Sequence, residues 1–347
     1  MSIRKAVSVR LERILGFDRE RLVRFPWAAK TGSVYYIVRR CHGWGGVGFF
    51  SNYLYALTHI AYAKDRGWIP VVDMRNYRTL YSETHPVNGS RNDWEHYFIQ
   101  PVDTRTAYAS GRFILSDGWN RKSEYHPIRE TDETMELIPD RAAKLRESCA
   151  DYTLLRPEIQ SSFLNWEQTH FAGKKILGIH WRGTDKRTPP PGHRPTTPME
   201  DLLAAVRELK DRHDPDLVFL ASDEKGVRDR IEAEIRLPVI EAEAYRLEVG
   251  DRRGLHLASI RHPRTNHRYL LGLEVLRDAW LLSRCHYLVH GHSNVVNAAL
   301  LFRDKPFEDR ILVSSGPRLS SRHPPVRRQT PSISGPTDSS PSEQPDT

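Results

Sequence analysis

The sequence predicts an α/β protein built on parallel sheets, because short apolar strands alternate with amphipathic helices along most of its length. The chain has 347 residues, enough for two domains of ordinary size, and its hydrophobic content of 39% can supply their cores. Parallel strands joined by helices need right-handed crossovers, so the carboxyl ends of the strands gather along one edge of each sheet. Ligands of open α/β sheets bind in the crevice outside that edge.

The first half contains one clear strand–helix–strand unit. An apolar strand, a helix with apolar residues at helical spacing and a second strand are expected at residues 34–38, 50–66 and 68–73. Residues 74–125 show no clean period and are expected to be loops and short helices. Residues 140–171 are expected to form a helical stretch that leads into the second half.

The second half alternates more regularly. Strands are expected at residues 174–181, 216–221, 237–240 and 287–289. Helices are expected at residues 224–235, 268–284 and 294–302, and from Thr197-Pro198-Met199-Glu200, which has the spacing of a capping box. The pair Asp214-x-Asp216 begins a strand, on the wrong edge for a site, and is predicted to be a turn rather than a metal ligand.

Composition and charge restrict the function classes. The formal charge of +8 and the pI near 9.4 suit an anionic partner such as a nucleotide, a nucleic acid or a membrane surface. Nucleic-acid binding is not expected, because the arginines are dispersed rather than clustered. Three widely spaced cysteines without a C-x-x-C pair argue against a disulfide framework or a zinc site. No secretory signal or spanning segment is found, so we expect a cytoplasmic protein.

The two ends of the chain differ from the rest. Residues 1–25 are predicted to be a basic amphipathic helix, which either lies on an anionic membrane or packs against its own domain. Residues 316–347 are rich in Pro, Ser and Arg and are expected to be disordered. Between them, residues 26–172 and 173–315 are expected to be the two domains, so that membrane contact, if made, is peripheral and through the first 25 residues.

Polar residues follow the predicted strands of the second half. His180 and Arg182 end one strand, with Asp185-Lys186 just beyond, and an Arg fork matches phosphate oxygens two at a time. Ser293 begins a helix directly after another strand, where the first amides of the helix form an anion site. The alternatives are a strand end with solvated charges and a routine Ser N-cap.

A glycine-rich turn follows the first strand. The spacing Gly43-x-Gly45-x-x-Gly48, with Asp73 closing the next strand, matches the dinucleotide fingerprint and gives the alternative of a nicotinamide or flavin enzyme. Two arginines at 39–40 interrupt the strand before the turn and weaken that match. The same turn could let a carbohydrate or phosphate approach the backbone, or simply need positive φ values.

Together these pieces resemble the fucosyltransferase superfamily that includes the α-1,6-fucosyltransferases, the nodulation fucosyltransferases and the protein O-fucosyltransferases. Three blocks carry the resemblance, in the family's order: Gly45-Gly46-Val47-Gly48-Phe49-Phe50-Ser51-Asn52, then His180-x-Arg182-x-x-Asp185-Lys186, then Glu274 through Asp278-Ala279-Trp280 to Gly291-His292-Ser293-Asn294. The strand that ends at Ser222-Asp223 also fits.

The resemblance implies the GT-B architecture, two Rossmann-like domains that face each other across a cleft, with the nucleotide on the second. It implies that His180 and Asp278 contact guanine, and that Arg182 and Ser293 contact the phosphates. Lys186 would help to neutralise the departing diphosphate. The remaining site residues that it implies are Asp185 for catalysis, Ser222, Asp223 and Asn294 for the donor, and Gly45, Gly46, Gly48 and Asn52 for the glycine loop.

The activity implied is an inverting, metal-independent transfer of a sugar, L-fucose before others, from a GDP-sugar to a glycan hydroxyl, with no cofactor. One position departs from the family: the α-1,6 enzymes have Glu four residues after the motif Lys, where this chain has Pro190. Either another carboxylate is the base or leaving-group stabilisation carries most of the rate. The alternatives are a degenerate transferase that only binds a glycan or polyanion, and an NAD(P)-dependent oxidoreductase.

Overall fold

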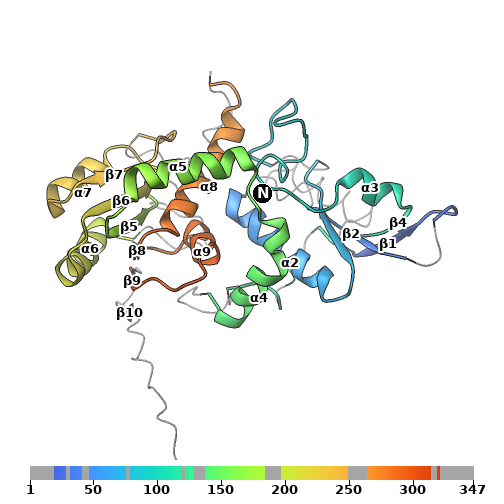
Figure 1. Ribbon diagram of the computed structural model, residues 1–347, viewed down its shortest axis with the longest axis horizontal. Coiled ribbons are helices and arrows are strands. Elements are labelled where there is room, and N and C mark those ends of the chain that lie inside the picture. The colour runs from blue at the N-terminus through green and yellow to red at the C-terminus, as the bar shows by residue number, and fades with distance from the viewer. Residues whose placement is uncertain are drawn as a thin grey trace, which may run out of the picture.

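Two sheets lie at opposite ends of the molecule, with helices between and around them (Figure 1). The computed structural model describes residues 19–28, 32–40, 47–75, 79–118, 122, 124–128, 137–183, 197–248 and 264–313, together with the backbone of 319–320. Within this part of the chain, no helix has the length and apolar content needed to cross a bilayer.

The four-stranded sheet has the order β1 (Arg21–Arg24), β4 (Arg112–Leu115), β2 (Tyr35–Val38) and β3 (Ile69–Val72). β2 is parallel to both β3 and β4, while β1 is antiparallel to β4 and forms an edge. Helix α2 (Phe49–Lys64) connects β2 to β3, as the sequence predicted. Pro70 is tolerated because β3 is the other edge of the sheet.

Two predictions for the first half were wrong in part. Within the helix predicted at residues 1–25, residues 21–24 form β1 instead, because pairing with β4 places Val23 in the small core beside Phe113, whereas residues 1–18 lie outside the described residues. The stretch 74–125 is not only loops and helices, since it contains β4 as well as helix α3 (Thr104–Ala109). Both missed strands are four residues long, too short for a visible alternation.

The six-stranded sheet has the order β10 (Leu319–Ser320), β9 (Asp309–Leu312), β8 (Tyr287–His290), β5 (Ile176–Trp181), β6 (Leu217–Ser222) and β7 (Val239–Ile240). Its strands from β9 to β7 are all parallel, which confirms the α/β prediction, and β10 is antiparallel. β9 and β10 were not predicted. Apart from the backbone of β10, the predicted tail 316–347 lies outside the described residues.

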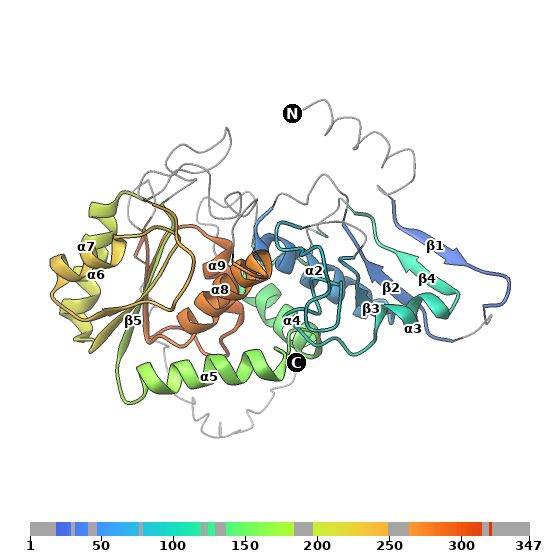
Figure 2. The same cartoon turned by 90° about the horizontal axis from the view of Figure 1, so that it is seen from above.

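Helices cover both faces of the six-stranded sheet (Figure 2). One face packs on α6 (Met199–His213) and α7 (Val227–Ile235), and the other on α5 (Pro157–Phe171), α8 (His267–Leu282) and α9 (Asn294–Leu301). β5 and β6 are therefore buried along their whole length, as is typical of central parallel strands. The core on the α8 face continues into α2, so it joins the two halves.

Several helix starts differ from the prediction, among them those of α5, α6 and α7 (Val227–Ile235), the last predicted from residue 224. The stretch 140–171 is two helices, α4 (Pro139–Cys149) and α5, because Pro157 disfavours helical backbone at the residue before it. α6 begins at Met199 without the predicted capping box, since the Thr197 hydroxyl donates to the Val313 carbonyl at 2.9 Å instead. The turn predicted at 214–216 is confirmed: Asp214 is left-handed and ends α6.

Candidate functional site

A cavity of about 180 Å³ lies between the two halves, at the carboxyl edge of the six-stranded sheet. Its walls come from the first turn of α2, the ends of β5 and β6, and the facing sides of α8 and α9. It brings together seven of the residues predicted for the site: Gly48, His180, Arg182, Ser222, Asp223, Asp278 and Asn294. These come from five separate elements or their ends, so only the tertiary fold assembles them.

The other predicted residues are placed differently. Ser293 immediately precedes Asn294 as the N-cap of α9. Asn52 lies in the first turn of α2 and lines a second cavity, of about 20 Å³, rather than the large one. Its side chain accepts a hydrogen bond from Arg40 at 2.5 Å. The remaining four predicted residues lie outside the described residues, as does Pro190: Gly45, Gly46, Asp185 and Lys186.

β5 delivers His180 and Arg182 to the cavity. Burial, followed by the charge of Arg182, lowers the pKa of His180 to about 3, so its imidazole is neutral at neutral pH. His290 stands beside it in register on β8 and has its pKa lowered to about 3 as well, mainly by burial. A neutral imidazole has one donor and one acceptor nitrogen, which suits a base rather than a phosphate.

Asp278 is the most unusual group in the cavity. Its side chain, on α8, is 8% exposed, and its Oδ1 is buried without a hydrogen-bond partner among the described residues. Burial raises the pKa of Asp278 to about 7, although the charges of Arg246 and Arg277 lower it. Buried acceptors are nearly always satisfied in folded proteins, so an unsatisfied one facing a cavity indicates a missing donor.

The strand ends after β5 and β6 are tied to each other. The Gly183 amide donates to Asp223 at 3.0 Å, and the Trp181 indole donates to Glu224 at 3.3 Å. A Cβ atom at Gly183 would overlap the Glu224 carboxylate and the Trp181 indole nitrogen, so a larger residue would require these side chains to shift. These bonds hold the backbone on both sides of Arg182 and leave Asp223 an internal hydrogen-bonding role as well as a place in the cavity wall.

The amino end of α9 points at the cavity, since Asn294 and Val295 both line it. The Ser293 hydroxyl accepts a hydrogen bond from the Val295 amide at 3.2 Å, so the N-cap alternative is confirmed. The role does not exclude ligand contact, because the same hydroxyl still has a proton to donate. A helix amino end carries a partial positive charge that favours anions.

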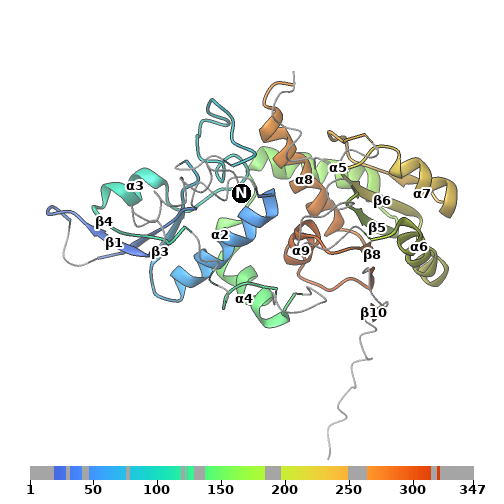
Figure 3. The same ribbon diagram turned by 180° about the vertical axis from the view of Figure 1, so that it is seen from behind.

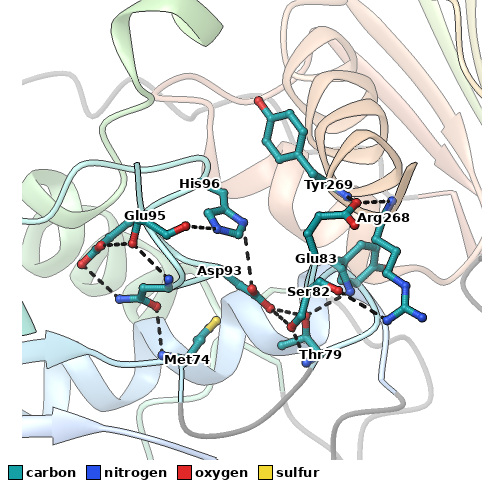
Figure 4. A network of polar contacts seen from close by, with 12 residues as sticks. Met74, Thr79, Ser82, Glu83, Asp93, Glu95, His96, Arg268 and Tyr269 are labelled. Atoms are coloured by element: carbon teal, nitrogen blue, oxygen red, sulfur yellow. Dashed lines mark hydrogen bonds and ion pairs between the residues drawn. The ribbon is translucent and has the colours of Figure 1, made fainter. Parts of the chain in front are cut away.

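Tyr81 faces this edge from the first half and was missed by the sequence analysis, because it lies in a stretch without periodicity. Its hydroxyl accepts a hydrogen bond from the Phe49 amide at 2.9 Å, and burial raises its pKa to about 12. Figure 4 shows the polar network that holds this loop: Thr79 and Ser82 both donate to the buried carboxylate of Asp93.

The same loop caps α8. A Glu83 carboxylate oxygen accepts from the backbone amides of Arg268 and Tyr269, at 2.8 and 3.1 Å (Figure 4). Negative charge at the start of a helix is favourable. Further along α8, Glu274 accepts from the Tyr245 amide at 3.2 Å, and this fixes Tyr245 in the cavity wall. Tyr245 is a second wall residue that sequence patterns did not reveal.

The features behind the metal and dinucleotide alternatives can be examined directly. Among the described residues, no group of three or more His, Cys, Asp or Glu side chains could hold a metal ion. Asp73, which the dinucleotide fingerprint needs for ribose, is fully buried and does not line the cavity. It accepts hydrogen bonds from Arg75 at 3.0 Å and from Tyr108 at 2.9 Å.

No known protein-family profile matches the chain, and no curated protein matches its sequence. Solved structures of fucosyltransferases are similar to it. NodZ alpha-1,6-fucosyltransferase co-crystallized with GDP is 20% identical, with a TM-score of 0.47 over 81% of this chain and 95% of that one. One NodZ structure comes from Bradyrhizobium. POFUT1 in complex with GDP is 10% identical, with a TM-score of 0.41 over 82% of this chain and 99% of that one.

A third similar structure is a variant of Arabidopsis thaliana FUT1 in complex with GDP. It is 10% identical, with a TM-score of 0.44 over 89% of this chain and 76% of that one. These three proteins are fucosyltransferases, the family that the sequence motifs resemble. With TM-scores below 0.5 and identities of 20% or less, the likeness says nothing by itself about the activity of this chain.

Proposed function

We propose that this chain is a glycosyltransferase that binds a GDP-sugar in the 180 Å³ cavity and transfers the sugar, L-fucose before others, to a glycan hydroxyl. One observation carries the proposal: Oδ1 of Asp278, for which the described residues offer no hydrogen-bond partner, shares the cavity with Arg182 and with the amino end of α9. The cavity thus offers an acceptor at one place and positive charge at another, which is what a guanine nucleotide requires.

Guanine fits the Asp278 side of the cavity. Its Watson–Crick edge presents the N1–H and N2–H donors, and an ionised carboxylate accepts both. Adenine has an acceptor at N1 and lacks the N2 amino group, so it would leave Asp278 unsatisfied. The neutral imidazole of His180 lies in the same cavity and can bond a further polar atom of the base.

The diphosphate fits the part of the cavity that Arg182 and the start of α9 line. The Arg182 guanidinium can bond two phosphate oxygens at once, and the amides and hydroxyl at the start of α9 add donors. Lys186 follows Arg182 by four residues in the sequence, and we assign it to the same phosphates. Charge stabilisation of this kind needs no metal, so the proposal includes none.

In the reaction, the acceptor oxygen forms a bond to the anomeric carbon as the bond from that carbon to the β-phosphate oxygen breaks. GDP leaves with the electron pair, and the anomeric configuration inverts through an oxocarbenium-like transition state. The three carboxylates that line the cavity already have other roles. Asp223 accepts a hydrogen bond from the Gly183 amide, Glu274 forms an ion pair with Arg264, and Asp278 is assigned to guanine. We therefore propose that leaving-group stabilisation by Arg182 carries most of the rate.

The two sheets are the cores of the two domains in this proposal. Residues 26–172 would form the acceptor-side domain and residues 173–315 the nucleotide-binding domain of a GT-B enzyme, facing each other across the cavity. We place the protein in the cytoplasm. The degenerate-transferase alternative keeps the same cavity without turnover, whereas the NAD(P) alternative is disfavoured by the position of Asp73.

The test is calorimetric titration of the full chain with GDP, GDP-fucose and ADP in EDTA. We expect micromolar binding of GDP and GDP-fucose, much weaker binding of ADP, and loss of binding in Arg182→Ala. Arg228→Ala is the matched control, since Arg228 is exposed on α7 and does not line the cavity. A folded protein that binds NADPH but not GDP would contradict the proposal. Donor binding without GDP release from GDP-fucose across an acceptor screen would favour the degenerate transferase.

A further inference from the structure

An exposed group of arginines and apolar side chains surrounds β1, at the end of the molecule remote from the six-stranded sheet (Figures 1 and 3). We call it the β1 tip and define it as Arg19, Arg21, Leu22, Arg24, Phe25 and Trp27. Leu22 is 58% exposed, Phe25 38% and Trp27 71%. These are three of the six large hydrophobic residues that are exposed in the described chain, and they fall within six positions. Such clustering marks an interaction surface.

The two aromatic side chains are held in place although they face solvent. Their rings stack with centroids 4.6 Å apart at an angle of 16°. The Phe25 amide donates to the Gly111 carbonyl at 2.8 Å, and the Ala28 amide closes a turn onto the Phe25 carbonyl at 3.0 Å. Gly111 has φ of 64°, and a Cβ there would lie 2.9 Å from the Trp27 indole nitrogen. The tip is therefore preordered, which lowers the entropy lost on binding a partner.

All the charged side chains of the β1 tip are positive. Arg19, Arg21 and Arg24 are exposed, and none of them forms an ion pair with another described residue. The only acid between positions 19 and 28, Glu20, turns inward and bonds Lys122 at 3.2 Å and Tyr36 at 3.1 Å. The partner of this surface must therefore supply negative charge together with an apolar region.

A second copy of the chain does not meet that requirement. β1 is an edge strand, and two such strands could pair through their free edges. The register that pairs all four residues of β1 with a second copy would place Arg21 of each copy opposite Arg24 of the other, and directly opposed like charges destabilise a sheet. A bilayer with anionic lipids meets both requirements, because Trp and Phe insert at headgroup level while arginines contact phosphates.

We propose that the β1 tip docks this protein on an anionic lipid surface. Phe25, Trp27 and Leu22 enter the interface, and the three arginines bind lipid phosphates. Because the tip lies away from the six-stranded sheet, docking leaves the cavity open to its ligands (Figure 3). This inference does not depend on the proposed activity, since it follows from exposure and charge alone.

The test is flotation of the full chain with vesicles of phosphatidylcholine alone and of equimolar phosphatidylcholine and phosphatidylglycerol. We expect flotation with the anionic vesicles, weakened by salt, and little with phosphatidylcholine alone. At about 1 kcal/mol for each arginine near such a surface, the double variant Arg21→Gln, Arg24→Gln should lower the partition coefficient roughly thirtyfold. The separate double variant Phe25→Ser, Trp27→Ser should lose most of the vesicle binding that the unmodified chain shows.

Matched controls separate the tip from general effects. Leu154→Ser removes an apolar side chain that is 56% exposed elsewhere, and Arg228→Gln with Arg230→Gln removes two exposed charges on α7. Both should float like the unmodified chain, and circular dichroism should show every variant folded. Flotation that is absent, or equal in the tip variants and the unmodified chain, would overturn the proposal; in the second case another segment, such as residues 1–18, would be responsible.

Discussion

The carboxyl edges of the two sheets carry similar polar residues but use them differently. In the four-stranded sheet, the described residues at that edge bond one another: Arg39 donates to the Ser116 carbonyl at 2.9 Å, and Asp117 pairs with Lys122 at 3.0 Å. Asp73 is likewise held by Arg75. In the six-stranded sheet, the corresponding edge opens on the cavity, and an oxygen of Asp278 has no partner within the described part of the chain.

The difference shows what distinguishes a structural edge, where polar residues of a sheet only stabilise the fold, from a binding edge, where they contact a ligand. Charged residues at strand ends are common to both sheets, so residue type does not separate them. The separating feature is that the unsatisfied oxygen of Asp278 lines a cavity of about 180 Å³, because a ligand there can recover the free energy that an unsatisfied buried group costs. We therefore expect substitutions at one edge to change stability and substitutions at the other to change binding.

The largest expected effect compares two arginines. Arg182→Ala should weaken GDP binding by on the order of a hundredfold or more, since it removes a bidentate phosphate contact from a protected cavity. Arg39→Ala should leave GDP binding unchanged. It should lower the free energy of unfolding by roughly 1–3 kcal/mol, because the Ser116 carbonyl loses the hydrogen bond that Arg39 donates. Calorimetry and urea unfolding measure the two. Loss of GDP binding in Arg39→Ala would contradict the proposed difference between the two sheet edges.

The pH dependence of donor binding comes next. Asp278 has a pKa of about 7 in the empty protein, and guanine donors favour its ionised form, so binding below pH 7 must release a proton. GDP-fucose, whose diphosphate does not titrate in this range, should bind about thirtyfold more tightly at pH 8 than at pH 5.5. Asp278→Asn should flatten the profile and weaken binding roughly 10- to 100-fold at pH 8. A variant profile that is as steep as the original would show that another group titrates.

Stability should respond in opposite directions to the same substitution at the two edges. Because the pKa of Asp278 is raised, its contribution is full below pH 4 and is lost as pH rises through 7. Asp278→Asn should therefore stabilise the empty protein at pH 8. Asp73→Asn should instead destabilise it by roughly 1–3 kcal/mol, because it breaks the pairing with Arg75. Urea midpoints at pH 8 that move in the same direction for both variants would contradict this difference.

The smallest effect concerns His290, on the binding edge. Its pKa is lowered to about 3, so its contribution to stability is present above pH 6.5 and is lost as pH falls. Between pH 6.5 and 5.5 that loss should amount to about 1 kcal/mol. His290→Asn should remove this part of the pH dependence in urea unfolding. An unchanged slope would mean that the imidazole can be protonated in the folded protein without penalty.

Much of the scaffold could be predicted from sequence, because the apolar pattern of each central strand and each helix lies within that element. β5, β6 and β8 follow from continuous apolar runs, which buried parallel strands show, and their helices follow from apolar residues at helical spacing. β1, β4 and β9 could not be predicted, because a short strand is fixed by the partner that pairs with it. Pro157 was the available signal for the break between α4 and α5.

The site divides in the same way. The sequence by itself placed Arg182 after a strand and Ser293 at the start of a helix, since chain direction decides which residues reach the carboxyl edge. Asp278 was expected within a helix and entered the site only through the family resemblance. Only the tertiary structure brought Tyr81 and Tyr245 into the cavity wall, because they lie in loops that other elements hold. The tertiary structure also decided which buried polar groups lack a hydrogen-bond partner among the described residues. Such partners come from any neighbour in space, so a local sequence pattern does not reveal them.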